Sequence, residues 1–168
     1  DQINGDLIKG KKVAVIGLGV GMHHANFYYN NNNTTLKYVY DIDSLKMKQA
    51  SEIFNNIKCA NNFDQIISDD EIDIISIASY DDSHYLQVSK GLNAKKHIFV
   101  EKPLCQNKEQ LDKIYSLHQK NKNLVISSNF PLRTTPRFVN LKNQIKAGSF
   151  GEILSFELCY FWGRPDKI

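Results

Sequence analysis

Short apolar runs rich in β-branched residues alternate along the chain with longer segments in which apolar residues recur at helical spacing. The runs predict strands over residues 12–17, 36–40, 57–60, 72–79, 98–101 and 124–128, of which 57–60 has the weakest pattern. The longer segments predict helices over residues 22–29, 44–55, 63–68, 83–93 and 108–120. Strands that are apolar on both sides belong in a parallel sheet covered by helices on two faces. The sequence therefore predicts an α/β fold with a doubly wound parallel sheet.

The pattern changes after residue 130. A helix is predicted over 135–146, a turn over 148–151 and an apolar strand over 153–162. This strand has no partner within the chain, and a lone strand is not stable by itself. We therefore expect residues 1–130 to form one complete domain and residues 131–168 to begin a second, α+β domain. On this interpretation the sequence is the amino-terminal part of a longer protein.

Composition and cysteine spacing set broad limits. With 168 residues, 42% of them hydrophobic, the chain can bury one sizeable core but not two. No apolar run reaches the roughly 18 residues of a membrane span, and no signal peptide opens the sequence. Three cysteines, Cys59, Cys105 and Cys159, lie far apart, which argues against a disulfide framework or a zinc cluster. We expect a cytoplasmic protein with reduced thiols, no membrane contact and no metal site.

Charge gives no sign of a nucleic-acid partner. Lys and Arg number 21 against 18 Asp and Glu, a net charge of +3, and the basic residues are spread along the chain. A nucleic-acid binder of this size more often carries a basic stripe interleaved with aromatic residues.

A glycine-rich turn follows the first predicted strand directly. Gly17 suits a tight turn, Gly19 lets a pyrophosphate approach the backbone, and the amides of the next helix attract an anion. With Leu18, Val20 and Gly21, these residues form the predicted phosphate-binding turn.

An acidic residue ends the second predicted strand. Asp41, followed by Ile42, stands where a carboxylate accepts hydrogen bonds from the ribose hydroxyls of an adenosine. This carboxylate repels a 2′-phosphate, so NAD is favoured over NADP. One departure from the usual Gly-x-Gly-x-x-Gly pattern is that Met22 occupies the third glycine position while Gly21 comes one residue early. A slightly shifted helix entry is therefore expected.

Four segments together resemble the family of NAD(P)-dependent oxidoreductases that includes glucose–fructose oxidoreductase, inositol dehydrogenase and MocA. They are GLGVGMHHA at 17–25, YDID around Asp41, SYDDSH at 79–84 and HIFVEKPL at 97–104. The resemblance covers residues 11 to about 165, and the Glu101-Lys102-Pro103 tripeptide is its most specific element. It implies that residues 1–130 are the Rossmann dinucleotide-binding domain and that the missing part is a substrate domain.

The resemblance also implies roles for individual residues. In the family, the Lys of Glu-Lys-Pro lies beside the nicotinamide and the reacting hydroxyl, so Lys102 is the expected catalytic residue. Glu101 is expected to orient Lys102 or to contact the cofactor. The family's Lys-Pro peptide is often cis, a state that the sequence cannot show.

Further cofactor contacts are implied at the ends of other strands. Ser79 and Tyr80 replace a family Thr-Pro pair beside the cofactor, and His84 matches a family histidine that could equally serve only in packing. Asn129 matches a position bordering the nicotinamide, and Arg133 could meet an anionic substrate or be an ordinary surface residue. His24 also matches a family position, where a structural role is expected.

The resemblance implies an NAD-dependent oxidoreductase that transfers hydride between nicotinamide and the hydroxyl of a sugar, nucleotide-sugar or polyol. By itself this chain would bind NAD but turn over little, and the full-length protein is expected to be a homo-oligomer. Two alternatives remain open. One is a non-catalytic NAD-binding regulatory or interaction protein of the same fold, and the other is an enzyme that reduces a ring or an imine.

Overall fold

The computed structural model describes residues 9–159 and 161. In chain order the elements of the first 129 residues are β1 (Lys11–Ile16), α1 (Gly21–Asn30), β2 (Thr34–Tyr40), α2 (Ser44–Ile53), β3 (Lys58–Cys59), α3 (Phe63–Ile67), β4 (Ile74–Ile77), α4 (Asp81–Asn93), β5 (His97–Val100), α5 (Lys108–Gln119) and β6 (Ile126–Ser128). All six predicted strands are present; β3, β4 and β6 are shorter than the apolar runs that predict them.

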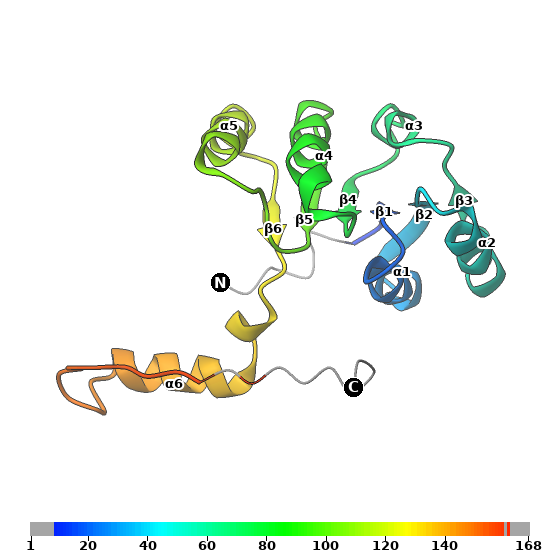
Figure 1. Cartoon of the computed structure of the whole chain (residues 1–168). Helices are drawn as coiled ribbons and strands as arrows, with labels where there is room; N and C mark the ends of the chain where they lie inside the picture. Colours follow the sequence, from blue (N-terminus) through cyan, green and yellow to red (C-terminus); the bar gives the residue numbers. More distant parts are fainter. Residues whose placement is uncertain (1–8, 160, 162–168) are drawn as a thin grey trace. The chain divides into compact units, whose positions relative to one another are not determined.

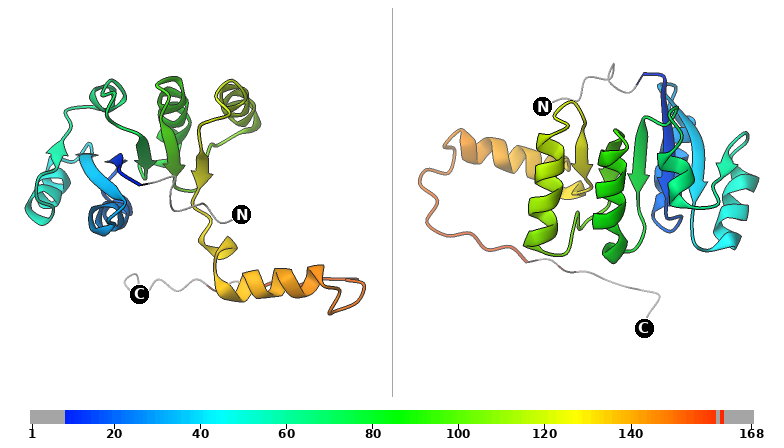
Figure 2. Two further views of the ribbon diagram at one scale, coloured as in Figure 1. Left: turned by 180° about the vertical axis from the view of Figure 1, so that it is seen from behind. Right: turned by 90° about the horizontal axis from the view of Figure 1, so that it is seen from above.

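The six strands form one parallel sheet in the order β3-β2-β1-β4-β5-β6. Helices α1 and α2 cover one face, and α3, α4 and α5 cover the other (Figures 1 and 2). The strand order reverses between β1 and β4, where a doubly wound sheet leaves a crevice at the carboxyl ends of its strands. The predicted Rossmann architecture is confirmed.

Burial on both faces explains the apolar runs. In β1, Ala14 and Ile16 pack into a core cluster with α4 and α5, whereas Val15 packs into a second cluster with α1 and α2. All three are buried, as expected for a strand at the centre of a parallel sheet.

Helices α2, α3 and α5 begin at the expected residues 44, 63 and 108, whereas α1 and α4 begin one and two residues earlier than expected. Asp43 caps α2 by accepting from the Leu45 amide, and Asn107 caps α5 by accepting from the Gln110 amide. Helix α4, which was expected to begin at residue 83, begins at Asp81. Asp81 and Asp82 lie in its first turn, where their charges favour the positive end of the helix dipole.

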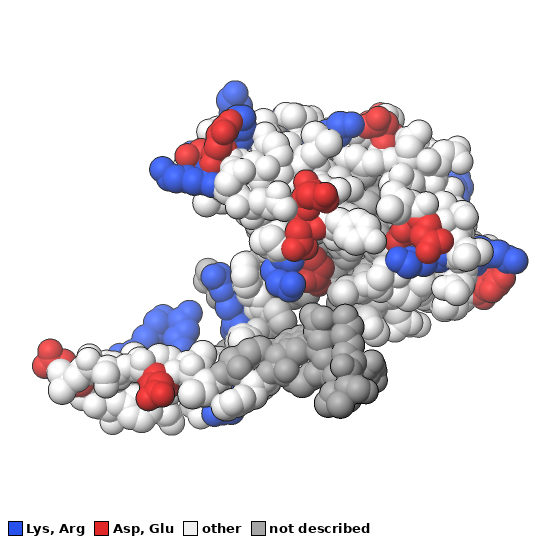
Figure 3. Space-filling model, in the orientation of Figure 1, with Lys and Arg blue, Asp and Glu red and all other residues white. Residues whose placement is uncertain are grey.

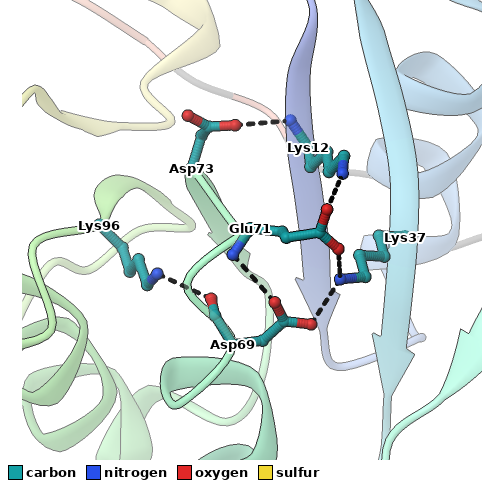
Figure 4. A network of polar contacts seen from close by, with 6 residues as sticks. All are labelled: Lys12, Lys37, Asp69, Glu71, Asp73 and Lys96. Atoms are coloured by element: carbon teal, nitrogen blue, oxygen red, sulfur yellow. Dashed lines mark hydrogen bonds and ion pairs between the residues drawn. The ribbon is translucent and has the colours of Figure 1, made fainter.

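A network of charged side chains joins the amino ends of the strands (Figure 4). Lys37 Nζ lies 2.6 Å from both Asp69 and Glu71, and Glu71 also pairs with Lys12. The Lys12 amide donates to Asp73 at 2.9 Å, and Lys96 Nζ donates to the Asp69 carbonyl at 2.8 Å. The network ties β1 and β2 to the loops before β4 and β5.

The chain divides into two compact units, residues 1–129 and 130–168. In the second unit the structure has a short 3-10 helix, Pro131–Arg133, and α6, Pro136–Lys146. The strand expected over 153–162 does not form at 153–159 or at 161, while residues 160 and 162 lie outside the described residues. A strand needs a hydrogen-bonded neighbour, and none is present for this segment in the described part of the chain.

Two surface properties bear on function. Over the first unit, basic and acidic side chains lie in mixed groups on the face drawn in Figure 3 rather than in one basic stripe. Within residues 9–159, no helix has the length and apolar character needed to cross a membrane.

Candidate cofactor site

The turn between β1 and α1 requires glycine at its first position. Gly17 donates its amide to the Tyr40 carbonyl at 2.8 Å and has a φ of +81°. A Cβ atom built there would lie 2.4 Å from the Ala78 carbonyl oxygen. Only glycine can bring the end of β1 so close to the end of β4, and this approach shapes the crevice between them.

The other two glycines of the turn have different tasks. At Gly19 a Cβ would meet nothing within 4 Å, so the backbone there is open to an approaching group. At Gly21 a Cβ would lie 3.1 Å from Ala78 Cβ and 3.3 Å from Val15 Cγ1. Gly21 therefore provides the close helix-to-strand packing that the third glycine of the motif usually provides. Met22, at the usual third position, packs partly buried into the core cluster of α1 and α2.

Asp41 closes the glycine turn from the end of β2. Its carboxylate is only 7% exposed and accepts hydrogen bonds from the amides of Leu18 at 2.6 Å and Asp43 at 2.8 Å. Lys46 Nζ lies 3.9 Å from the same carboxylate. Because each carboxylate oxygen has two lone pairs, both oxygens can still accept from a ligand hydroxyl.

A pocket of about 200 Å³ opens at this edge of the sheet, between the ends of β1, β2 and β4. It brings together six of the residues expected at the cofactor, which are Gly17, Gly19, Asp41, Ile42, Ser79 and Tyr80. The sequence did not single out Lys46, Ser83 and Gln87, which also line it. Gln87 binds the Ser79 hydroxyl at 2.6 Å, but a polar residue one turn into a helix carries no pattern that would reveal this contact.

Three residues of the expected glycine turn do not line this pocket. The Leu18 side chain is buried in the core cluster of α1 and α2, and Gly21 is buried against β1. Val20 is exposed at the start of α1. Leu18 and Gly21 could therefore contact a cofactor only through their backbone atoms. Val20 could contact it only from outside the pocket or through its backbone.

The Glu-Lys-Pro segment follows β5 at the same carboxyl edge, and its Lys102–Pro103 peptide bond is cis. Glu101 Oε1 accepts from Asn129 Nδ2 at 2.6 Å and lies 3.1 Å from His24 Nε2. Glu101 and Asn129, each expected beside the cofactor, are therefore in direct contact. Lys102 is exposed, and no carboxylate of the described residues lies within ion-pair distance of it.

Two histidines flank this segment. Burial lowers the pKa of His24, although the neighbouring Glu101 carboxylate raises it. His84 is completely buried, with Nδ1 2.7 Å from the Pro103 carbonyl and Nε2 3.2 Å from the Ser79 carbonyl. His84 thus stands behind the pocket wall rather than in it. Arg133 lies in the second unit, stacked 4.8 Å from the Phe130 ring centroid.

The family match follows the first unit closely. A sequence profile described as an oxidoreductase family with an NAD-binding Rossmann fold matches residues 11–129. The chain belongs to this family. Among its relatives is the inositol 2-dehydrogenase of Salmonella typhimurium, 26% identical over 146 residues, which cover 85% of this chain and 44% of the relative. The myo-inositol 2-dehydrogenase of Thermotoga maritima is likewise 26% identical, over 84% of this chain and 42% of its own length.

Solved structures agree on the fold. The myo-inositol dehydrogenase of Lactobacillus casei in complex with NAD(H) and myo-inositol superposes with a TM-score of 0.78 at 29% identity, over 83% of this chain and 42% of that one. The scyllo-inositol dehydrogenase of the same organism with bound NAD(H) and scyllo-inositol gives a TM-score of 0.80 at 24% identity, over 86% and 43%. The chain spans less than half the length of the curated relatives it matches.

Proposed function

We propose that this chain is the cofactor-binding part of an NAD-dependent oxidoreductase that moves hydride between nicotinamide and a hydroxyl of a sugar, nucleotide-sugar or polyol. The carrying observation is the pocket at the reversal of strand order, where the glycine turn and the Asp41 carboxylate meet. Inositol dehydrogenases among the relatives support the polyol class.

The residues present fit an NAD molecule. The amides of Gly19 and Val20 donate to no other described residue and lie at the start of α1, where partial positive charge favours a pyrophosphate. Asp41 would take the ribose hydroxyls of the adenosine half, and Ile42 and Tyr80 would flank the adenine. Bound NAD supplies the hydride acceptor.

Lys102 is the residue that we assign to the chemistry. It is exposed at the carboxyl edge, next to the Glu101–Asn129 pair, and it has no ion-pair partner in the described residues. A lysine amine without a fixed carboxylate partner is free to bind a substrate hydroxyl and assist the transfer of its proton. Asn129 would border the nicotinamide.

Three further proposals concern the whole protein. We place a domain boundary near residue 130, supported by the division of the chain between residues 129 and 130. The cytoplasm is the proposed location, supported by three free cysteines, Cys59, Cys105 and Cys159. Residues 131–168 would begin a substrate and oligomerisation domain in a homo-oligomer.

Parallel calorimetric titrations with NAD and NADP test the proposal. We expect saturable binding that prefers NAD, and in Asp41→Ala a dissociation constant for NAD raised at least about tenfold, because the ribose loses its charged acceptor. Asp73→Ala, which removes a carboxylate from the opposite edge, is the control and should leave the affinity unchanged. No binding of either nucleotide by the folded chain would contradict the proposal and favour a non-catalytic role.

A further inference from the structure

The Glu101-Lys102-Pro103 segment leaves the sheet between helices on opposite faces. Helix α1 lies below β4 and β5 in Figure 1, and α4 lies above them. One histidine reaches the segment from each helix, the half-buried His24 from α1 and the buried His84 from α4. Neither lines the pocket described above.

His24 holds the Glu101 side chain through a directed chain of hydrogen bonds. Glu101 accepts at 3.1 Å, so His24 Nε2 carries the proton and donates it to this carboxylate. His24 Nδ1 is then the acceptor for the Ser76 hydroxyl at 3.0 Å. Burial raises the pKa of Tyr28, which also lies on α1. The ring is fixed at both nitrogens and rests edge-on against Phe99, with centroids 5.3 Å apart.

His84 holds the backbone on the other side. Both of its ring nitrogens face carbonyl oxygens, which only accept hydrogen bonds, and the shorter contact, 2.7 Å, is to Pro103. We assign an N–H to Nδ1 on this ground. Nε2 of the same ring lies 3.2 Å from the Ser79 carbonyl oxygen, so the ring sits between the loop after β4 and the loop after β5.

The segment has few other tethers. The Glu101 amide donates to Ile77 at 2.8 Å, which ends the ladder between β4 and β5. Beyond that point the Lys102 amide meets only the neighbouring Glu101 carboxylate, at 3.3 Å, and Pro103 has no N–H. Among the described residues, His84 is the partner of the Pro103 carbonyl.

We propose that His24 and His84 are positioning residues. They hold the Glu101–Pro103 turn in place from opposite faces of the sheet, so that the Lys102 backbone is fixed while its side-chain amine stays exposed. The role in catalysis rests on the proposed function of Lys102. The positioning of the turn by the two histidines is a property of the chain without ligand.

Cys105 provides a reporter for the turn. It lies two residues after Pro103, burial raises the pKa of its thiol, and its Sγ contacts the Asn107 carbonyl at 3.7 Å. Loosening the turn should expose this thiol. In His84→Ala and His24→Ala we expect thiol-reagent labelling of Cys105 and amide hydrogen exchange at residues 102–105 to rise about fivefold or more, the factor for one lost hydrogen bond.

His118→Ala is the matched control. His118 also binds a backbone carbonyl, that of Leu124 at 3.0 Å, but it lies on α5 away from the turn. Labelling of Cys105 should stay at the wild-type rate in this variant. In every variant, the exposed Cys59 serves as the internal reference.

Gln variants separate positioning from general loss of stability. His84→Gln and His24→Gln keep an N–H donor on a side chain of similar reach, so each should restore much of the wild-type protection at residues 102–105. Unfolding in urea gives the global free energy for each variant. The proposal is overturned if folded His84→Ala labels at the wild-type rate, or if exchange rises equally over all strands of the sheet.

AMP and NAD titrations keep this proposal distinct from the proposed function. AMP probes the pocket at Asp41, which His24 does not touch, so His24→Ala should bind AMP normally and lose about fivefold in NAD affinity. Equal losses for AMP and NAD would contradict a role confined to the turn. If the wild-type chain binds no NAD, the proposed function fails. The labelling of Cys105 still tests whether the two histidines position the turn.

Discussion

The two edges of the sheet differ in how their charged groups are paired. At the amino edge, charged side chains satisfy one another: Lys37 lies 2.6 Å from both Asp69 and Glu71 (Figure 4). At the carboxyl edge, Asp41 is bound by backbone amides and Lys102 has no ion-pair partner among the described residues. The amino edge has little capacity left for a ligand, whereas the carboxyl edge keeps donors and acceptors free.

This difference shows where stability and function reside in the same sheet. Ion pairs that link adjacent strands and loops fix the register at one end, and mostly exposed pairs of this kind contribute little individually. The buried His84 and the glycine turn at Gly17 shape the other end. Changes at the amino edge should therefore alter stability alone, while changes at the carboxyl edge should alter nucleotide binding.

The largest effect is expected at the glycine turn. Gly17→Ala forces a Cβ against the Ala78 carbonyl and a positive φ on an L-residue, so we expect a loss of at least about 2 kcal/mol in the free energy of unfolding and no NAD binding. Gly10→Ala is the matched control, because Gly10 has a φ of +72° but open space around it, at the amino edge. It should lose about 1 kcal/mol and bind NAD normally. Urea denaturation and calorimetry measure both; equal effects of the two variants would contradict the comparison.

Asp41→Asn should have the next largest effect. An amide can accept on one side only, so its NH2 group faces the N–H of Leu18 or Asp43. We expect a stability loss of about 1 to 3 kcal/mol and an NAD dissociation constant raised at least about tenfold. Asp73→Asn, which replaces a carboxylate that accepts from the Lys12 amide and from Lys11 at the other edge, should cost stability and leave NAD affinity unchanged. Weaker NAD binding in Asp73→Asn would argue against the separation of the two edges.

Tyr80→Ala tests the expected stacking on adenine. Tyr80 is 71% exposed and lines the pocket, so its removal should leave the unfolding free energy nearly unchanged. AMP affinity should fall about fivefold, the lower range for loss of one base-stacking contact. Tyr115→Ala, which removes a similarly exposed tyrosine on α5, is the control. Unchanged AMP affinity in Tyr80→Ala would place the adenine elsewhere.

The smallest effect is expected from pH, and at the amino edge it arises at Glu71. Hydrogen bonds from Lys12 and Lys37 lower the pKa of Glu71 from 4.5 to about 2. Because this folded-state pKa is depressed, the stabilisation is present above pH 4.5 and is lost as the pH falls toward 2. In Glu71→Gln the loss of stability over this window should be shallower. An unchanged acid profile in Glu71→Gln would contradict a depressed pKa at Glu71 in the folded chain.

A second pH window involves one histidine at each edge, His24 at the carboxyl edge and His97 at the amino edge. Burial lowers the pKa of His24 below its ordinary value of 6.5, so the unfolded chain binds the proton first and stability falls as the pH drops below 6.5. Burial also lowers the pKa of His97, which therefore shares this window. His24→Gln should flatten the profile between about pH 6.5 and 5 only in part, and denaturation measured across this range checks it. A profile identical to wild type would contradict burial of the neutral ring.

Much of the fold could be predicted because the central strands are buried on both faces. The run at 12–17 can only be a core strand, and the glycines after it have no other explanation than a tight turn before a helix. The expected strand at 153–162 failed over the residues described, since strand formation depends on a partner that the sequence does not contain. The spacing of apolar residues can be read from the sequence, whereas the residues that a segment contacts in the fold cannot.

The same limit applies to the site. The glycine turn and the Asp41 position follow from local pattern, and the structure brings them together. Ser76 lies within an apolar strand, and nothing in that run indicates that its hydroxyl meets His24. Likewise, the position of His84 at a helix start shows no sign that its ring spans two loops. Such contacts come from crossing elements, which only the three-dimensional arrangement reveals.

Amide spectra of the 15N-labelled chain during titration with NAD test the central claim most directly, because they locate the nucleotide on the sheet. We predict saturable shifts in the amides of residues 17–21, 41–42 and 79–80, with those of residues 69–73 at the amino edge unchanged. Shifts centred on residues 69–73, or none at any NAD concentration in a folded chain, would contradict the assignment of the carboxyl edge as the cofactor site.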